Sequence, residues 1–224
     1  MSGGIWHGLG CVSYRAGLAI QDRVADERAR GIRPDTLLLL EHPPTVTLGR
    51  RGSHRDLVWS VDRLVESRIG VERAGRGGGA TYHGPGQLVG YPIVRVSHQG
   101  RGVRRFVADL ETLLVEASRV FEVAAERRAG RTGVWVGDRK LASIGIEVRR
   151  GISRHGFAWN VDMNLEPFQA IVPCGEPGLR LTDLSREAAT KITIAAASEA
   201  LLGAWRNRFG PMGEEILHEL EAHD

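Results

Sequence analysis

Apolar residues recur with helical spacing in four segments of the chain. The clearest is residues 103–121, where they form a one-sided stripe: Val103, Phe106, Val107, Leu110, Leu113, Leu114, Ala117 and Val120. Residues 14–30 predict a moderately amphipathic helix, and residues 192–208 predict a final helix. Residues 60–67 predict a short capped helix with three inward residues, Val61, Leu64 and Val65.

Extended runs outnumber these helices. They predict strands at residues 36–41, 45–48, 71–74, 87–96, 133–136, 140–148 and about 155–162. Residues 137–139, Gly-Asp-Arg, are typical of a hairpin turn. Because several strands are joined by hairpins rather than by helices, the pattern predicts an α+β fold. We expect a single domain with a mixed, mainly antiparallel sheet flanked by helices, and not a doubly wound parallel sheet.

Composition fits one globular domain over residues 1–224, since 42% of the residues are hydrophobic and 25% are charged. No apolar run approaches the roughly 18 residues of a membrane helix, and the N-terminus lacks the regions of a secretory signal. The two cysteines, Cys11 and Cys174, lack the spacing of a metal site or a disulfide framework. We therefore expect a cytoplasmic protein without a metal.

The net charge of +3 does not require nucleic acid as a partner. Arginine pairs are scattered along the chain and form no stripe interleaved with aromatic residues, which single-stranded nucleic acid would favour. We expect neither nucleic acid nor a membrane as a partner, and a monomer is the default.

Residues 76–86 form a glycine-rich segment with five glycines in eleven positions. Glycines let a ligand approach the main chain, and exposed N–H groups can hold an anion or a carbonyl oxygen. The segment is not a phosphate-binding loop, because no Gly-Lys-Ser/Thr follows it. A surface turn is the alternative interpretation, and His83 within the segment can be a structural hydrogen-bonding residue.

Lys140 is one of only two lysines in the chain, the other being Lys191. It opens a predicted strand in which alternate residues are apolar: Ala142, Ile144, Ile146 and Val148. Desolvation on an apolar face disfavours an ammonium group, which makes a lysine a usable base. The alternative is a lysine at the sheet edge whose ammonium reaches water.

Cys174 lies between Pro173 and Gly175, which favours a tight corner and not a regular element. Such a corner can present a thiol as a nucleophile, although free cysteines are also common as small buried apolar residues. A thiol and a lysine form a coherent pair, because the thiolate is the nucleophile and a nearby amine can accept its proton or stabilise its charge.

Five blocks of sequence, in order, resemble the lipoyl(octanoyl) transferases. The blocks cover about residues 36–190 and are Glu41–Arg50, Arg76–Leu88, Lys140–Gly145, His155–Val161, and Pro173–Gly175 with Leu181–Leu184. Gly79 and Ala80 depart from the family, whose members often carry a larger or charged residue there. Residues 210–224 lie outside the resemblance and receive no role.

The resemblance implies the mixed sheet shared with lipoate and biotin ligases. It implies that Cys174 carries the acyl group as a thioester and that Lys140 is its base. It also implies that three segments surround the acyl group; their residues are Arg76, Gly77, Gly78, Gly79, Ala80, Thr81, Tyr82, His83, Ser143, Ile144, Gly145, Gly156, Phe157 and Ala158.

The implied reaction moves an octanoyl or lipoyl group from the thioester of an acyl carrier protein to a lysine of lipoyl domains, including those of 2-oxoacid dehydrogenase complexes and the glycine cleavage H protein. No cofactor beyond the carrier's phosphopantetheine is expected. The alternatives are an ATP-dependent lipoate ligase of the same fold and a non-catalytic protein that binds lipoyl domains. The selectivity for acyl chain length stays open.

Overall fold

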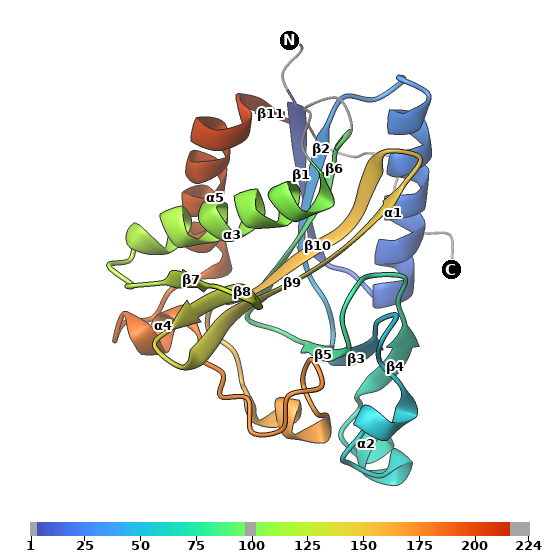
Figure 1. The fold of residues 1–224 in the computed structure, drawn as a ribbon, viewed down its shortest axis with the longest axis vertical. Helices are drawn as coiled ribbons and strands as arrows, with labels where there is room; N and C mark the ends of the chain where they lie inside the picture. Colours follow the sequence, from blue (N-terminus) through green and yellow to red (C-terminus); the bar gives the residue numbers. More distant parts are fainter. Residues whose placement is uncertain (1–3, 97–101, 216–224) are drawn as a thin grey trace.

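The structure, a computed structural model, describes residues 4–96 and 102–215. Its main element is a sheet whose strands lie in the order β11-β1-β2-β6-β10-β9-β8-β7 (Figure 1). Their bounds are β1 Gly4–Cys11, β2 Thr36–Glu41, β6 Gln87–Ile93, β7 Glu126–Arg128, β8 Arg131–Val136, β9 Arg139–Arg149, β10 Ile152–Asn160 and β11 Met212–Glu214. β1 pairs in parallel with both neighbours, and the other pairings are antiparallel. The expected mixed, mainly antiparallel sheet is confirmed.

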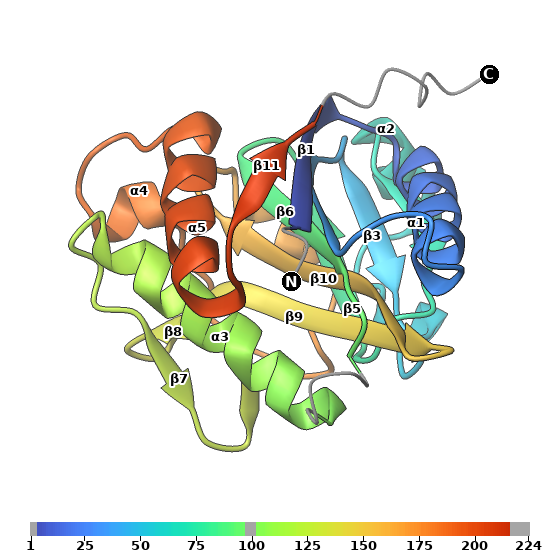
Figure 2. The same cartoon turned by 90° about the horizontal axis from the view of Figure 1, so that it is seen from above.

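Helices cover both faces of this sheet (Figure 2). Helices α3 (Val103–Arg119) and α5 (Ile194–Phe209) pack on one face, and α1 (Tyr14–Ala29) packs on the other. The α3 stripe buries its central residues, among them Leu110, Leu113 and Leu114. A side chain caps the N-terminus of α1, where Ser13 Oγ accepts a bond from the Ala16 N–H at 3.2 Å.

Strand β2 explains why a central strand has a continuous apolar sequence, here four consecutive leucines. Leu37 and Leu39 join the core on the α3 and α5 face, whereas Leu38 and Leu40 join the core on the α1 face. All four side chains are buried, because alternate residues point to opposite faces and helices cover both.

A second, three-stranded sheet lies beside the first, in the order β4-β3-β5. It consists of β3 (Thr45–Leu48), β4 (Gly70–Arg73) and β5 (Ala80–His83). Helix α2 (Val61–Glu66) belongs to this part of the chain, and Leu64 joins the sheet's apolar core. A further short helix, α4 (Leu184–Glu187), follows the segment that carries Cys174.

Several sequence predictions need correction. Val61 and Val65 were expected to point inward, but they are 70% and 69% exposed, because the single turn and a half of α2 buries only Leu64. The pattern missed β11, the edge strand of the main sheet, and β1 beside it, because both strands contain exposed residues and their apolar alternation is weak. It also missed β5, which lies inside the glycine-rich segment.

The C-terminal stretch 210–224, which received no role, contributes strand β11, and Met212 pairs with Gly4 of β1. The rest of that stretch, from residue 216, lies outside the described residues. Within the part of the chain that the structure describes, none of the helices combines the length and apolar character needed to cross a bilayer.

The orientation of α2 predicts unequal effects of two truncations. Leu64→Ala removes a side chain that is 2% exposed, so it should lower the free energy of unfolding by about 2–5 kcal/mol. Val65→Ala, on the exposed side, should change it by less than about 0.5 kcal/mol. Urea unfolding followed by circular dichroism measures both, and equal losses would contradict the placement of α2.

Candidate active site

Lys140 and Cys174 lie together where the two sheets meet. The Lys140 Nζ donates to the Cys174 Sγ at 3.5 Å, although 34 positions separate the residues. The lysine is 4% exposed, and the cysteine is half-buried. The thiol is therefore open to a substrate while the amine beside it is shielded from water. The other cysteine, Cys11, is exposed on β1.

Cys174 occupies the tight corner that the flanking residues predict. Its φ is +56°, a value uncommon outside glycine, and Gly175 follows at +72°. The Cys174 N–H donates to the Ala80 carbonyl oxygen at 2.9 Å, and Pro173 forms a parallel bridge with the same residue. A Cβ at Gly79 would lie 3.3 Å from the Cys174 carbonyl carbon. The corner is thus fixed against the small sheet.

Strand β9 and its neighbours fix Lys140. Its N–H donates to the Arg180 carbonyl oxygen at 2.8 Å, and its own carbonyl accepts from the Thr182 N–H at 3.0 Å. A Cβ at Gly133 would lie 2.6 Å from the Lys140 Cε, so a glycine there makes room for the lysine stem. The Nζ lies 5.3 Å from the centre of the Trp135 ring, a cation–π distance.

The strict alternation expected from Lys140 onward is not kept. Val134 pairs with Ala142, but Trp135 pairs with Lys140, so β9 carries one extra residue at this point. Leu141 and Ala142 are both buried in the core as a result. The bulge separates Lys140 from the regular period of the strand that follows.

Arg76 holds the glycine loop, residues 76–79, against β3. Its Nη1 donates to the carbonyl oxygens of Gly77 and Gly79 at 3.1 and 3.0 Å. Its Nη2 donates to the carbonyl and hydroxyl oxygens of Thr47 at 2.9 and 2.8 Å. The side chain is buried, which lowers its pKa from the ordinary value. Arg76 therefore shapes the backbone of the loop from inside.

A cavity extends from Cys174 between the glycine loop and strands β9 and β10. It brings together residues from all three predicted segments: Arg76, Gly77, Gly78, Thr81, His83, Ser143, Ile144, Gly145, Gly156, Phe157 and Ala158. Four further lining residues come from α1, β6 and β10, and no sequence pattern assigned them to the cavity: Tyr14, Val89, Tyr91 and His155. Only tertiary packing brings these four to the cavity.

Three expected residues do not line the cavity. Gly79 packs on the backbone of Cys174, and Ala80 bonds to it. Tyr82 faces the core of the small sheet, where its ring meets Phe168 edge-on at 5.4 Å. These positions support the corner of the site rather than the wall of the cavity.

The inner wall is a cluster of neutral aromatic groups. Burial lowers the pKa of His42 to about 4 and that of His155 to about 3. Burial also lowers the pKa of His83 well below its ordinary value, and it raises the pKa of Tyr14 to about 12. The His42 Nε2 lies 2.6 Å from the Tyr91 hydroxyl. At neutral pH these histidine and tyrosine side chains therefore carry no charge, and Arg76 is the charged residue that lines the cavity.

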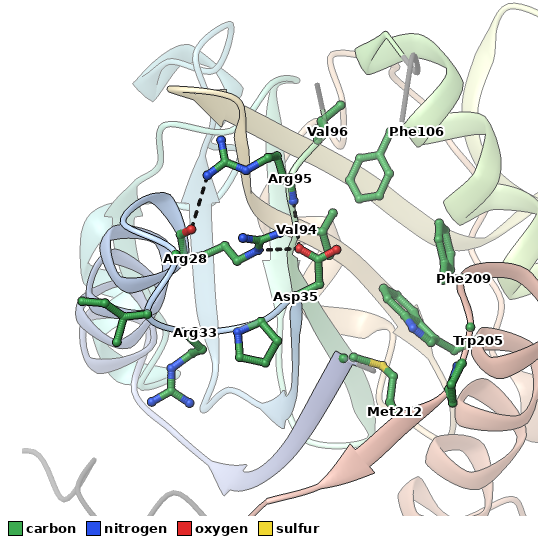
Figure 3. A pocket seen from close by; sticks show the side chains of 16 residues that line it. Arg28, Arg33, Asp35, Val94, Arg95, Val96, Phe106, Trp205, Phe209 and Met212 are labelled. Carbon is green, nitrogen blue, oxygen red and sulfur yellow. Dashed lines mark hydrogen bonds and ion pairs between the residues drawn. The ribbon is translucent and has the colours of Figure 1, made fainter. Parts of the chain in front are cut away.

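A larger cavity of about 590 Å³ lies elsewhere, between α1, α3, α5 and the edge of the main sheet (Figure 3). The carboxylate that lines this cavity already has hydrogen-bond partners: Asp35 accepts from the Arg28 Nε at 2.6 Å and from the Arg95 N–H at 3.1 Å. None of its sixteen lining residues is a cysteine, histidine or lysine. Among the described residues of the chain, no group of three or more acidic, histidine or cysteine side chains could hold a metal ion.

Two octanoyltransferases are similar to this chain in sequence over nearly their whole length. The octanoyltransferase of Geobacter metallireducens is 44% identical over 213 residues, covering 95% of each chain. That of Caldicellulosiruptor bescii is 40% identical over 218 residues, covering 95% of this chain and 96% of the relative.

Among solved structures, lipoate-protein ligase A bound with ATP matches with a TM-score of 0.82 at 17% identity, over 98% of this chain and 91% of that one. A putative lipoate protein ligase from Thermoplasma acidophilum with bound lipoic acid matches with 0.78 at 18% identity, over 98% and 91%. At these identities the likeness shows the fold alone. Residues 13–206 match the lipoyl protein ligase A/B catalytic domain, a wider span than the five blocks predicted. The chain belongs to this family of lipoyl protein ligase A/B catalytic domains.

Proposed function

We propose that this protein transfers an octanoyl group from an acyl carrier protein to a lysine of a lipoyl domain, through a thioester on Cys174. The observation that carries the proposal is the 3.5 Å contact between the Lys140 Nζ and the Cys174 Sγ. Relatives named octanoyltransferase, similar over nearly their whole length, support the reaction class.

In the acylation step, the neutral Lys140 amine accepts the thiol proton of Cys174. The thiolate then attacks the carbonyl carbon of the donor thioester. A new bond forms between the Sγ and the acyl carbon, and the bond to the carrier sulfur breaks. The Lys140 ammonium returns its proton to the departing carrier thiolate. Because one thioester replaces another, the step needs no ATP.

The glycine loop is the better candidate for binding the oxyanion. At the corner itself, the Cys174 N–H already donates to Ala80, and the Gly175 N–H donates to the Val172 carbonyl at 3.2 Å. Within the described residues, the N–H group of Gly78, which lines the cavity together with Cys174, has no hydrogen-bond partner. This donor can stabilise the negative charge that develops on the acyl oxygen.

The cavity offers a largely apolar environment for the octanoyl tail. Burial of the tail would contribute on the order of 5 kcal/mol, at about 0.8 kcal/mol per methylene. The cavity has a volume of about 50 Å³, less than twice the roughly 30 Å³ that one water molecule occupies in the liquid. An eight-carbon chain is larger, so side chains of the wall or the glycine loop move outward when it binds.

In the second step, the acceptor lysine attacks the Cys174 thioester, an amide forms and the thiolate of Cys174 leaves. Lys140 is the better base for the acceptor amine. The His83 Nδ1 lies 2.8 Å from the Gln87 Oε1, and its Nε2 lies 3.4 Å from the Thr47 hydroxyl, so both ring nitrogens face partners. Its lowered pKa also disfavours proton uptake. His83 serves as part of the wall.

The nucleophile can be tested by intact mass. Wild type mixed with octanoyl carrier protein should gain one octanoyl group that hydroxylamine removes. Cys174→Ser should lose this labile adduct, and the matched control Cys11→Ser should keep it, since Cys11 is exposed and far from Lys140 in the sequence. An adduct that persists in Cys174→Ser, or that maps to Cys11, would sink the mechanism.

The chain offers an unusually clean control for the base, because it contains only two lysines. Lys140→Ala should slow acylation of Cys174 by at least about 100-fold, the usual contribution of a positioned base. Lys191→Ala, at an exposed position, should leave the rate unchanged. Rapid-quench mass spectrometry gives the rates. A folded Lys140→Ala protein with the wild-type rate would remove Lys140 from the chemistry.

The source of the acyl group separates the proposal from its alternatives. Octanoyl carrier protein without nucleotide should support transfer to a lipoyl domain, whereas octanoate with ATP and Mg²⁺ should not. The reverse result would identify an ATP-dependent ligase. Transfer from neither donor, with tight binding of lipoyl domains, would identify a non-catalytic binding protein.

A further inference from the structure

His155 adopts a backbone conformation that strands do not normally contain. It lies within β10, yet its φ is +56°, in the left-handed region. A residue other than glycine there costs on the order of 1–3 kcal/mol and persists only where its surroundings hold it. The Gln21 Oε1 of α1 accepts from the His155 N–H at 2.7 Å, and the side chain is buried. The structure therefore holds this strained histidine in place.

The register of β9 and β10 shows in which order their lining residues follow one another along the cavity. Ser143 pairs with Ala158, Gly145 with Gly156, and Ile146 with His155. Lys140 and Cys174 mark the end near Ser143. The opposite end is closed by the start of the glycine loop, where the Gly77 N–H donates to the Ile146 carbonyl at 3.1 Å. His155 thus lies at the end of the cavity that is remote from the thiol.

The length of this path matches an octanoyl chain. Strand residues advance about 3.3 Å each, so the three steps from Ser143 to Ile146 span about 10 Å. An extended chain advances about 3.5 Å per three bonds, so the seven carbon–carbon bonds of an octanoyl group span about 8 Å. A tail that starts on Cys174 would end its run against the His155 ring.

We propose that His155, with Tyr91 beside it, is the end wall of the acyl cavity and sets the longest chain that the enzyme accepts. The two rings lie 6.5 Å apart and nearly perpendicular, at 84°. Both line the cavity, and although His155 opens one of the blocks of family resemblance, no sequence pattern assigned either residue to the wall. The inference rests on the proposed function, because it assigns the selectivity of the same site.

A neutral end wall suits the methyl end of an acyl chain. Burial, with the charges of Arg76 and Arg154 nearby, lowers the pKa of His155 to about 3, so its ring carries no charge at neutral pH. The Tyr91 hydroxyl is engaged with His42 and does not need a partner from the ligand. The end of the cavity therefore presents the uncharged rings of His155 and Tyr91 to the acyl chain.

The test shortens His155 without adding backbone strain. Glycine and asparagine both tolerate the left-handed region, so His155→Gly and His155→Asn remove ring volume while the chain keeps its path. Acylation of Cys174 is measured by intact mass with carrier proteins bearing eight-, ten- and twelve-carbon chains. Both variants should raise the rate for ten or twelve carbons relative to eight by about tenfold or more.

Tyr14→Leu is the matched control, because it removes an aromatic ring that α1 contributes to the wall, whereas His155 and Tyr91 belong to β10 and β6. It should leave the ratio of rates near the wild-type value. A ratio that rises equally or only in Tyr14→Leu would overturn the proposal, as would an unchanged ratio in the folded His155 variants. If wild type takes up no acyl group from any donor, the proposed function fails instead.

Discussion

The close approach of the Cys174 corner to the glycine loop is the constraint on which the site depends. A Cβ at Gly79 would lie 3.3 Å from the Cys174 carbonyl carbon, and one at Gly52 would lie 3.1 Å from the Gly79 carbonyl carbon. Three stretches of backbone therefore stack with no side chains between them. This stacking holds the backbone of Cys174 in its left-handed conformation. It also places the thiol within hydrogen-bond reach of the Lys140 amine.

The two sheets divide the work of building the site. In the small sheet, the Ala80 carbonyl accepts a hydrogen bond from the Cys174 N–H and so fixes the residue that carries the thiol. Thr47 accepts hydrogen bonds from Arg76 and so fixes the glycine loop. The main sheet provides the amine and the floor of the cavity through β9 and β10. Because the amine comes from the main sheet and the thiol from a loop bonded to the small sheet, their spacing depends on how these parts pack. The backbone bonds of Lys140 to residues 180–182 join β9 to the segment that follows Cys174.

The reactive residues and the elements that carry them could be predicted from the sequence. The residues that reach the cavity only through tertiary packing could not. The Pro-Cys-Gly corner, the strand of Lys140 and the amphipathic α3 all follow from composition and spacing, and the blocks of family resemblance linked them. Tyr14 and Tyr91 reach the cavity only because α1 packs across β6, which no local pattern encodes. The left-handed backbone conformation of His155 could not be predicted either, since the residues around it have the pattern of an ordinary strand.

The central claim is that the acyl group passes through Cys174 on its way to the acceptor. A chase of isolated octanoyl enzyme, freed of donor and mixed with a lipoyl domain, tests this most directly. Followed by intact mass, one octanoyl group should appear on the acceptor for each group that leaves Cys174, at a rate at least equal to steady-state turnover. An acceptor that gains octanoyl only when fresh donor is present, while the Cys174 adduct persists, would contradict the account.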